Sequence, residues 1–367
     1  MFDYMAASTL IYKPDWDIAR QNLIHWWEGK GMAIYLLTRR ELPRFSIDQP
    51  IASGDLERDW IEPSYRLALS EYEMAWHDYL AEAFPYFDTQ IGPGSLGIIL
   101  GSKPLFVEET VWYNPIIDDP DAFNSIHLNT HNNPILVQHL DVIDTGLRQA
   151  NDRYLVGVPD LIENLDTLAA LRGDQNLLMD LIERPTWVMD RLVEIIQAYF
   201  KVFDLFFGRV KDRWGGNAFS AFKIWGPGKT AKLQCDISAN LSPRMFRRFV
   251  LPGLQEQCEW LDYSLYHLDG TNCMQHIDAL LEIESLNAIE WTPQSGRPGG
   301  GSPEWFDLYK KIKAGGKSIQ AVGVEPEEVL PLLDAIGPDG VYILPSRAFT
   351  QAEAEGILTK LEPFRKN

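Results

Sequence analysis

The feature of the sequence that most restricts its fold is an alternation of short apolar segments with helical segments, which runs from about residue 217 to the C-terminus. The apolar segments have the length of buried strands, and the segments between them, roughly 10 to 18 residues long, have the length of helices. A parallel pair of strands needs a crossover connection, which a helix of this length supplies. The alternation therefore predicts a parallel sheet.

Further apolar segments nearer the N-terminus raise the number of predicted strands to about eight. The predicted strands are 32–37, 87–91, 154–158, 217–225, 264–270, 287–292, 318–322 and 341–344. Helices are expected before the first strand, over 15–28, and after it, over 55–83. Eight alternating units favour an α/β fold, a single (β/α)8 TIM barrel with an N-terminal helical extension that spans residues 1–367 as one domain.

The composition excludes several classes of function. The formal net charge of −19 argues against nucleic acid and anionic membranes as partners, because both require a basic surface. Three cysteines do not suggest a disulfide framework. No apolar run approaches the length of a membrane span, and residues 1–10 lack the pattern of a signal peptide. A cytoplasmic protein is expected.

The most informative single stretch is 264–270, Ser-Leu-Tyr-His-Leu-Asp-Gly, which reads as a buried strand ending in polar side chains. Side chains alternate along a strand, so His267 and Asp269 point to one face. A histidine and a carboxylate at the carboxyl end of a strand suit a metal site or an acid/base pair. A purely structural pairing of the two side chains is the alternative.

Other polar residues lie at or beyond the ends of predicted strands. Asp160 follows 154–158 and Glu290 lies in 287–292, and both are further candidates for catalysis. Asp236 lies in a short segment after 217–225 and is a candidate for substrate binding. Arg39 and Arg40 follow the first strand and suit the binding of a carboxylate or phosphate group. A solvated turn explains the two arginines equally well.

Three more residues are candidates for substrate binding. Lys223 and Trp225 are two residues apart in the predicted strand 217–225 and therefore share a face, and Trp291 lies in the strand 287–292. The alternatives are two tryptophans in the core and a lysine whose ammonium group reaches the surface.

The string S-P-R-M-F-R-R-F-V-L-P at 242–252, followed by Y-H-L-D-G at 266–270, resembles the uroporphyrinogen decarboxylase superfamily. That superfamily also contains methyltransferases that move methyl groups to or from corrinoid proteins or coenzyme M. The order of elements over 217–361 fits it, and 84–101 looks like its decarboxylase-like branch, so the resemblance covers most of the chain. It implies a TIM barrel and suggests a homodimer.

The chain departs from the superfamily pattern at two places. Where the porphyrinogen enzymes have Arg-Gln-Ala-Gly-Arg after the first strand, residues 38–44 read T-R-R-E-L-P-R. Where the zinc methyltransferases have His-x-Cys, His267 matches but Asp269 replaces the cysteine, and 344–347 (L-P-S-R) lacks their second cysteine. Carboxylate binds zinc, but thiolate is softer and suits thiol activation better.

Three functions follow from these residues. The first is a metal-assisted methyltransferase that acts with a corrinoid protein and holds zinc or another divalent ion on His267 and Asp269, with Glu290 or Asp160 as further ligands. The second is a cofactor-free decarboxylase or lyase, in which Arg39 and Arg40 hold a substrate carboxylate and Asp269 stabilises an electron-poor intermediate.

The third is a carbohydrate-active barrel that works with paired carboxylates. Its site would combine the two tryptophans with four strand-end acids: Trp225, Trp291, Asp160, Asp236, Asp269 and Glu290. A barrel that only binds a ligand is the alternative to all three enzymes.

Overall fold

A seven-stranded sheet forms the centre of the computed structural model, which describes residues 9–365. Neighbouring strands in this sheet are parallel, except that β2 is antiparallel to β1. In spatial order the strands are β2 (His77–Ala81), β1 (Met32–Arg39), β13 (Val341–Pro345), β12 (Ser318–Val324), β11 (Ala288–Thr292), β10 (Tyr263–Asp269) and β9 (Thr230–Gln234). The mostly parallel sheet predicted from the sequence is confirmed.

Three two-stranded ladders lie beside this sheet. They are β3 (Tyr86–Phe87) with β6 (Leu155–Val156), β4 (Lys103–Phe106) with β5 (Val111–Asn114), and β7 (Gly216–Phe219) with β8 (Ile224–Pro227). A single parallel bridge between Gly157 and Ala218 joins the first ladder to the third. The ladders within residues 9–365 do not close into one continuous barrel. The fold is therefore a mixed α/β fold compatible with a TIM-like barrel.

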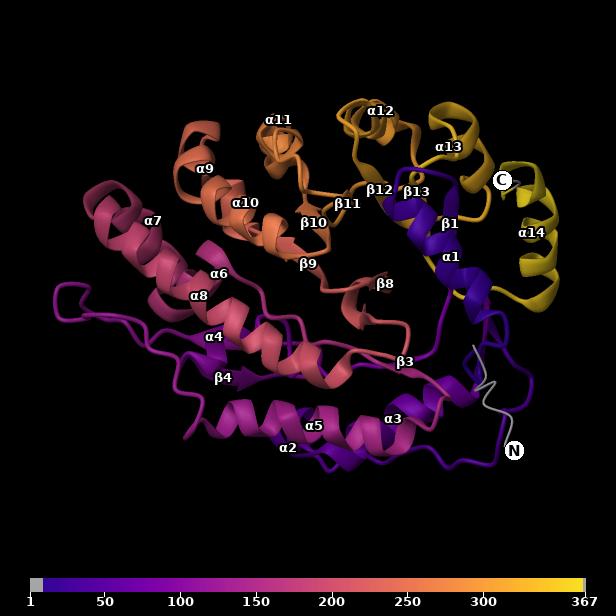
Figure 1. Ribbon diagram of the computed structural model, residues 1–367, viewed down its shortest axis with the longest axis horizontal. Helices are drawn as coiled ribbons and strands as arrows, with labels where there is room; N and C mark the ends of the chain where they lie inside the picture. Colours follow the sequence, from indigo (N-terminus) through magenta and orange to yellow (C-terminus); the bar gives the residue numbers. More distant parts are fainter. Residues whose placement is uncertain (1–8, 366–367) are drawn as a thin grey trace, which may run out of the picture.

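Helices cover the outside of the sheet. The α-helices are α1 (Trp16–Trp27), α2 (Leu56–Ile61), α3 (Pro63–Ala75), α4 (Ser95–Ile99), α5 (Pro134–Ala150), α6 (Asn164–Arg172), α7 (Asp174–Glu183), α8 (Pro185–Val210), α9 (Pro243–Phe249), α10 (Leu251–Trp260), α11 (Ile277–Leu281), α12 (Phe306–Ala314), α13 (Val329–Ile336) and α14 (Gln351–Arg365). Short 3-10 helices are η1 (Ser220–Phe222), η2 (Asp236–Asn240), η3 (Thr271–His276) and η4 (Pro303–Trp305). Figure 1 shows α9 to α14 as an arc outside the strands, with α2, α3 and α5 together on the opposite side.

Helix α1 packs against the amino ends of the strands. The indole N–H of Trp26 donates to the carbonyl of Ile319, at the start of β12, at 3.0 Å, and the indole N–H of Trp27 donates to the carbonyl of Trp225 at 2.9 Å. Both tryptophans are buried. The N-terminal helix thus covers one end of the sheet, which leaves the carboxyl ends of the strands available for a site.

The long helix α8 buries the apolar residues that recur at helical spacing in its sequence. Every member of its apolar stripe is buried: Val188, Leu192, Ile195, Tyr199 and Val202. An apolar stripe of this spacing faces the core because 3.6 residues make one helical turn.

Two regions differ from the prediction. Residues 217–225 are not one strand: β7 and β8 form a hairpin, and Lys223 lies in the turn between them with a left-handed backbone (φ 54°). Lys223 and Trp225 therefore do not share the face of one strand. The predicted helix over 55–83 is divided into α2, α3 and the strand β2, since the chain reverses after Ala75 to pair with β1.

The prediction from sequence also missed β9, which pairs in parallel with β10. Its segment was difficult to recognise because lysine and glutamine alternate with its apolar residues, yet all five positions are buried. Of the described residues, no helix is long and apolar enough to cross a membrane. Residues 1–8, which carry most of the segment in which a signal peptide was excluded, lie outside the described residues, and the single domain over 1–367 stays a prediction.

Candidate functional site

Three side chains converge at the carboxyl ends of β9 and β10. The ligand atoms of Asp236, His267 and Asp269 all lie within 4.8 Å of one another. The parallel register pairs His267 with Gln234, so Asp236, two residues beyond Gln234, is brought beside Asp269. The predicted common face of His267 and Asp269 is thus confirmed, while Asp236, predicted as a substrate-binding residue, is added to the possible metal ligands.

Glu290 supports His267. The register of β10 and β11 places the two residues side by side, and Nδ1 of His267 is hydrogen-bonded to Oε2 of Glu290. The other carboxylate oxygen accepts from the hydroxyl of Thr292. Burial lowers the pKa of His267, but the charge and hydrogen bond of Glu290 outweigh it, and the pKa is raised overall. Since Nδ1 is engaged, Nε2 is the atom of His267 left for a ligand.

Asp160 has a different role from the one predicted. Its carboxylate is buried and lies 2.8 Å from Nζ of Lys232, on β9. The same ammonium group contacts Oε1 of Gln234. Asp160 is therefore neutralised by an ion pair, and it is not a member of the group of ligand atoms that converges on His267. Its assignment as a further metal ligand was wrong.

Two acidic residues that were not predicted hold the backbone on both sides of Cys235, from Gln234 to Ile237. Asp166, on α6, accepts from the backbone N–H groups of Asp236 at 2.7 Å and Ile237 at 3.0 Å. Glu163, just before α6, accepts from the backbone N–H of Gln234 at 2.8 Å. Burial and the charge of Asp166 raise the pKa of Asp236 to about 6. The spacing of three residues between Asp160, Glu163 and Asp166 is the signal in the sequence that could have identified this acidic segment.

A cavity of about 730 Å³ opens beside Asp236. Asp166 and Gln234 also line it, together with Trp112 and Tyr113 of the β4–β5 hairpin. Its volume lies within the range of small-molecule sites. One member of the converging group thus faces a space that is large enough for a substrate.

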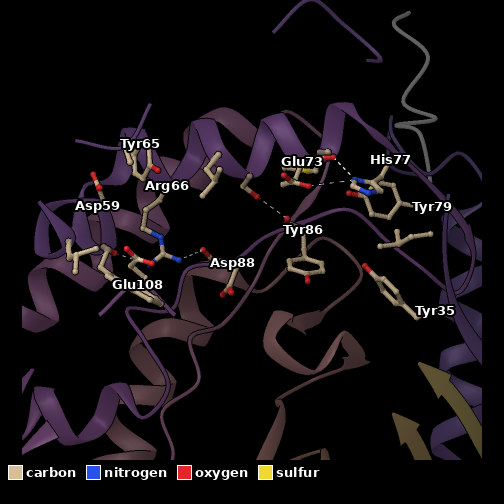
Figure 2. A pocket seen from close by; sticks show the side chains of 17 residues that line it. Tyr35, Asp59, Tyr65, Arg66, Glu73, His77, Tyr79, Tyr86, Asp88 and Glu108 are labelled. Carbon is tan, nitrogen blue, oxygen red and sulfur yellow. Dashed lines mark hydrogen bonds and ion pairs between the residues drawn. The ribbon is translucent and has the colours of Figure 1, made fainter. Parts of the chain in front are cut away.

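A second cavity, of about 590 Å³, lies between α3 and the strands β1, β2 and β3. Figure 2 shows Tyr86 and Tyr35 below α3, with Arg66 extending from the helix toward Asp88. Asp88, which directly follows β3, accepts from the hydroxyl of Ser220 at 2.9 Å, and burial raises its pKa. Asp88 was not predicted as a site residue, although it is the second residue of the predicted strand 87–91.

The predicted basic residues lie in different surroundings. Arg40 forms an ion pair with Asp78, which also binds Arg44, so its charge is already neutralised. Arg39 is exposed, with its guanidinium 5.9 Å from the ring of Trp76. The predicted pair of arginines for a substrate carboxylate is therefore reduced to Arg39.

Lys223 remains close to the interior of the fold. Its carbonyl accepts from the hydroxyl of Tyr342 at 2.7 Å, and its Nζ lies 5.3 Å from the ring of Tyr35. Burial lowers the pKa of the Lys223 ammonium group. The neighbouring Phe222 packs edge-on against His267, with ring centroids 5.0 Å apart. The η1 turn thus contacts the converging group from inside the fold.

Trp225 and Trp291 belong to the core. Both have no exposed surface, and the indole N–H of Trp225 donates to Asp212 at 2.7 Å. A side chain without exposed surface cannot stack on a sugar ring. The assignment of these two tryptophans to substrate binding was therefore wrong, because their strands present them to the packed interior.

Comparison with solved structures supports the fold. A methyltransferase from Methanosarcina mazei aligns with 94% of this chain and 97% of its own length, with a TM-score of 0.56 and 10% sequence identity. At this identity the similarity concerns the fold alone. No protein-family model matches the sequence, and no curated protein matches it either.

Proposed function

We propose that this protein is a methyltransferase-like enzyme that binds a divalent metal ion through Asp236, His267 and Asp269. The observation that carries the proposal is the convergence of their ligand atoms within 4.8 Å at the carboxyl ends of two adjacent parallel strands. Catalytic groups of α/β folds are found at this end of the strands. The similarity in fold to a methyltransferase supports the reaction class.

The donor atoms fit a particular kind of metal. One imidazole nitrogen and two carboxylates are common ligands of zinc and of other first-row divalent ions, and three protein ligands leave a position for substrate or water. Burial raises the pKa of the nearby thiol of Cys273 to about 11, so this thiol is protonated at neutral pH and is a poor ligand. Bound there, the metal would act as a Lewis acid that polarises the methyl-accepting or methyl-donating group.

The remaining residues have supporting tasks in this proposal. Glu290 fixes the ring orientation of His267, and Asp166 holds the backbone of Asp236, as outer partners of metal ligands commonly do. The cavity beside Asp236 would receive the small-molecule substrate. A corrinoid protein as the methyl-carrying partner rests on the family resemblance alone.

The first test is metal content. We expect the purified protein to retain close to one equivalent of zinc, manganese or iron after saturation and desalting, measured by plasma emission. His267→Ala should reduce the content to background, because the imidazole is the only nitrogen ligand of the group.

The matched control is His131→Ala, which removes an exposed histidine outside the group and should leave the metal content unchanged. Circular dichroism would verify that each variant is folded. A folded wild-type protein that binds none of the three metals, or a His267→Ala variant that binds as much as the wild type, would contradict the proposal. Once a metal is found, methyl transfer from methylcobalamin to candidate acceptors would test the reaction class.

A further inference from the structure

The cavity shown in Figure 2 is separate from the proposed metal site, since none of Asp236, His267 and Asp269 lines it. Its walls come from α2, α3, β1, β2 and β3, and its volume of about 590 Å³ is that of a small-molecule site. Nothing in the proposed methyl transfer uses this space, so the composition of its walls must be explained separately.

Aromatic side chains form much of the wall. The cavity is lined by Tyr35, Trp60, Tyr65, Tyr79 and Tyr86. Two of these rings already have a cation nearby: Lys223 Nζ lies 5.3 Å from the Tyr35 ring, and the guanidinium of Arg66 lies 6.0 Å from the Trp60 ring. The other three rings, those of Tyr65, Tyr79 and Tyr86, also line the cavity.

The charged groups of the lining are mainly carboxylates. They are Asp59, Glu73, Asp88 and Glu108. Glu73 and Glu108 are exposed at the rim, whereas Asp88 lies deeper, below α3 in Figure 2. Hydrogen bonds from the Ser53 backbone lower the pKa of Asp59, which keeps this carboxylate ionised. Any ligand that enters therefore meets negative charge at the rim.

The positive groups of the lining do not balance these carboxylates. Arg66 is the only lysine or arginine in the described lining, and its guanidinium donates to backbone carbonyls, those of Asp88 at 2.9 Å and Trp60 at 3.0 Å among them. Nδ1 of His77 lies 2.8 Å from the carbonyl of Glu73. Asp88 is left out of the charge balance because burial raises its pKa. The carboxylates of Asp59, Glu73 and Glu108 outnumber the single guanidinium of Arg66, so the cavity has a net negative charge.

We propose that this cavity binds an organic cation, with its ammonium group held by the tyrosine faces and the carboxylates. A cation over an aromatic face is attracted by the negative charge of the ring, and quaternary ammonium groups are recognised in this way. An anionic ligand would be repelled by the carboxylates, and a neutral ligand would gain nothing from them. The inference goes beyond the proposed function and does not depend on the metal.

The test uses three small molecules of nearly the same shape that differ in charge: choline, its neutral carbon analogue 3,3-dimethylbutan-1-ol, and the anion 3,3-dimethylbutanoate. Benzyltrimethylammonium is added as a larger cation. Binding to the full chain is measured by ligand-observed NMR and calorimetry. We expect the cations to bind at least about tenfold more tightly than the neutral analogue and the anion to bind least.

Two variants locate the site. Tyr86→Leu removes one ring and should weaken binding of both cations about fivefold or more. The double variant Glu73→Gln, Glu108→Gln changes only exposed rim residues, so it should fold normally, and it should weaken the cations but not the neutral analogue. The control is Glu57→Gln, an exposed carboxylate of α2 outside the lining.

Removal of metal with a chelator should leave cation binding unchanged, which separates this inference from the proposed function. The proposal is overturned if neither cation binds, if the neutral analogue binds as tightly as choline, or if the anion is preferred. It is equally overturned if Tyr86→Leu and the double rim variant both bind the cations with wild-type affinity, because the cations would then occupy another place.

Discussion

Glu163 provides the sharpest test of the electrostatics around the candidate site. Its side chain has no exposed surface, Oε1 accepts from the backbone N–H of Gln234, and Oε2 has no hydrogen-bond partner among the described residues. Burial raises the pKa of this carboxyl to about 8, although Lys232 opposes the shift. In the folded protein, Glu163 is therefore protonated at neutral pH.

The direction of the pH dependence follows from this shift. In the unfolded chain the pKa of the group returns to its ordinary value of 4.5, so between about pH 4.5 and 8 the folded state holds a proton that the unfolded state has lost. The contribution to stability is complete below pH 4.5 and is lost as the pH rises through 8. Each unit of pKa difference corresponds to about 1.4 kcal/mol, so between pH 5 and 8 the loss is at most about 4 kcal/mol.

Glu163→Gln replaces the titrating group by a neutral one of the same shape whose oxygen can still accept from Gln234. We expect the variant and the wild type to have similar free energies of unfolding at pH 5, and the variant to be the more stable one at pH 8. Urea unfolding at pH 5, 6, 7 and 8 would measure the difference, with Glu256→Gln, an exposed position on α10, as the control. Parallel stability profiles for the wild type and Glu163→Gln would refute the reasoning.

Two further predictions concern the support of the site and the packing of the fold. Asp166→Asn loses one of the two acceptors that hold the N–H groups of Asp236 and Ile237, so metal affinity in a competitive chelator titration should fall about 10- to 100-fold. The control is Asp174→Asn, an exposed residue that lines the cavity beside Asp236, and it should leave the affinity unchanged. Unchanged affinity in Asp166→Asn would contradict the supporting role of this residue. In Gly216→Ala the added methyl group would overlap the carbonyl oxygen of Gly226 and lie 2.8 Å from the Trp225 ring, so the free energy of unfolding should fall by about 1–3 kcal/mol. In Gly208→Ala, on α8, the added methyl group would meet no neighbouring atom within 4 Å, so the free energy of unfolding should rise by roughly 0.5–1 kcal/mol. Equal urea midpoints for the two variants would contradict both expectations.

The local order of strands and helices was largely accessible from the sequence. Apolar runs such as 264–270 and 287–292 are observed as β10 and β11, because a continuous apolar segment of this length has few other ways to bury itself. Strand alternation likewise placed His267 and Asp269 on one face. The segments that escaped prediction, β2 and β9, both contain polar residues. Those of β9 are buried and those of β2 partly buried, and each strand forms through pairing with a strand distant in the sequence.

The partners of each polar group were decided by the tertiary structure alone. The register between β9 and β10 brings Asp236 to His267, and the register between β10 and β11 makes Glu290 a support for the imidazole. Asp160 forms an ion pair with Lys232, and Arg40 forms one with Asp78, so neither side chain is free for the role predicted for it.

The sequence by itself thus determined the strands of the central sheet other than β2 and β9, and the polar end of β10, since both depend on patterns within a few residues. It did not determine which polar groups meet. That depends on hydrogen-bond register and ion pairs between residues far apart in the chain, such as Asp160 and Lys232, and therefore on the packing of the whole fold.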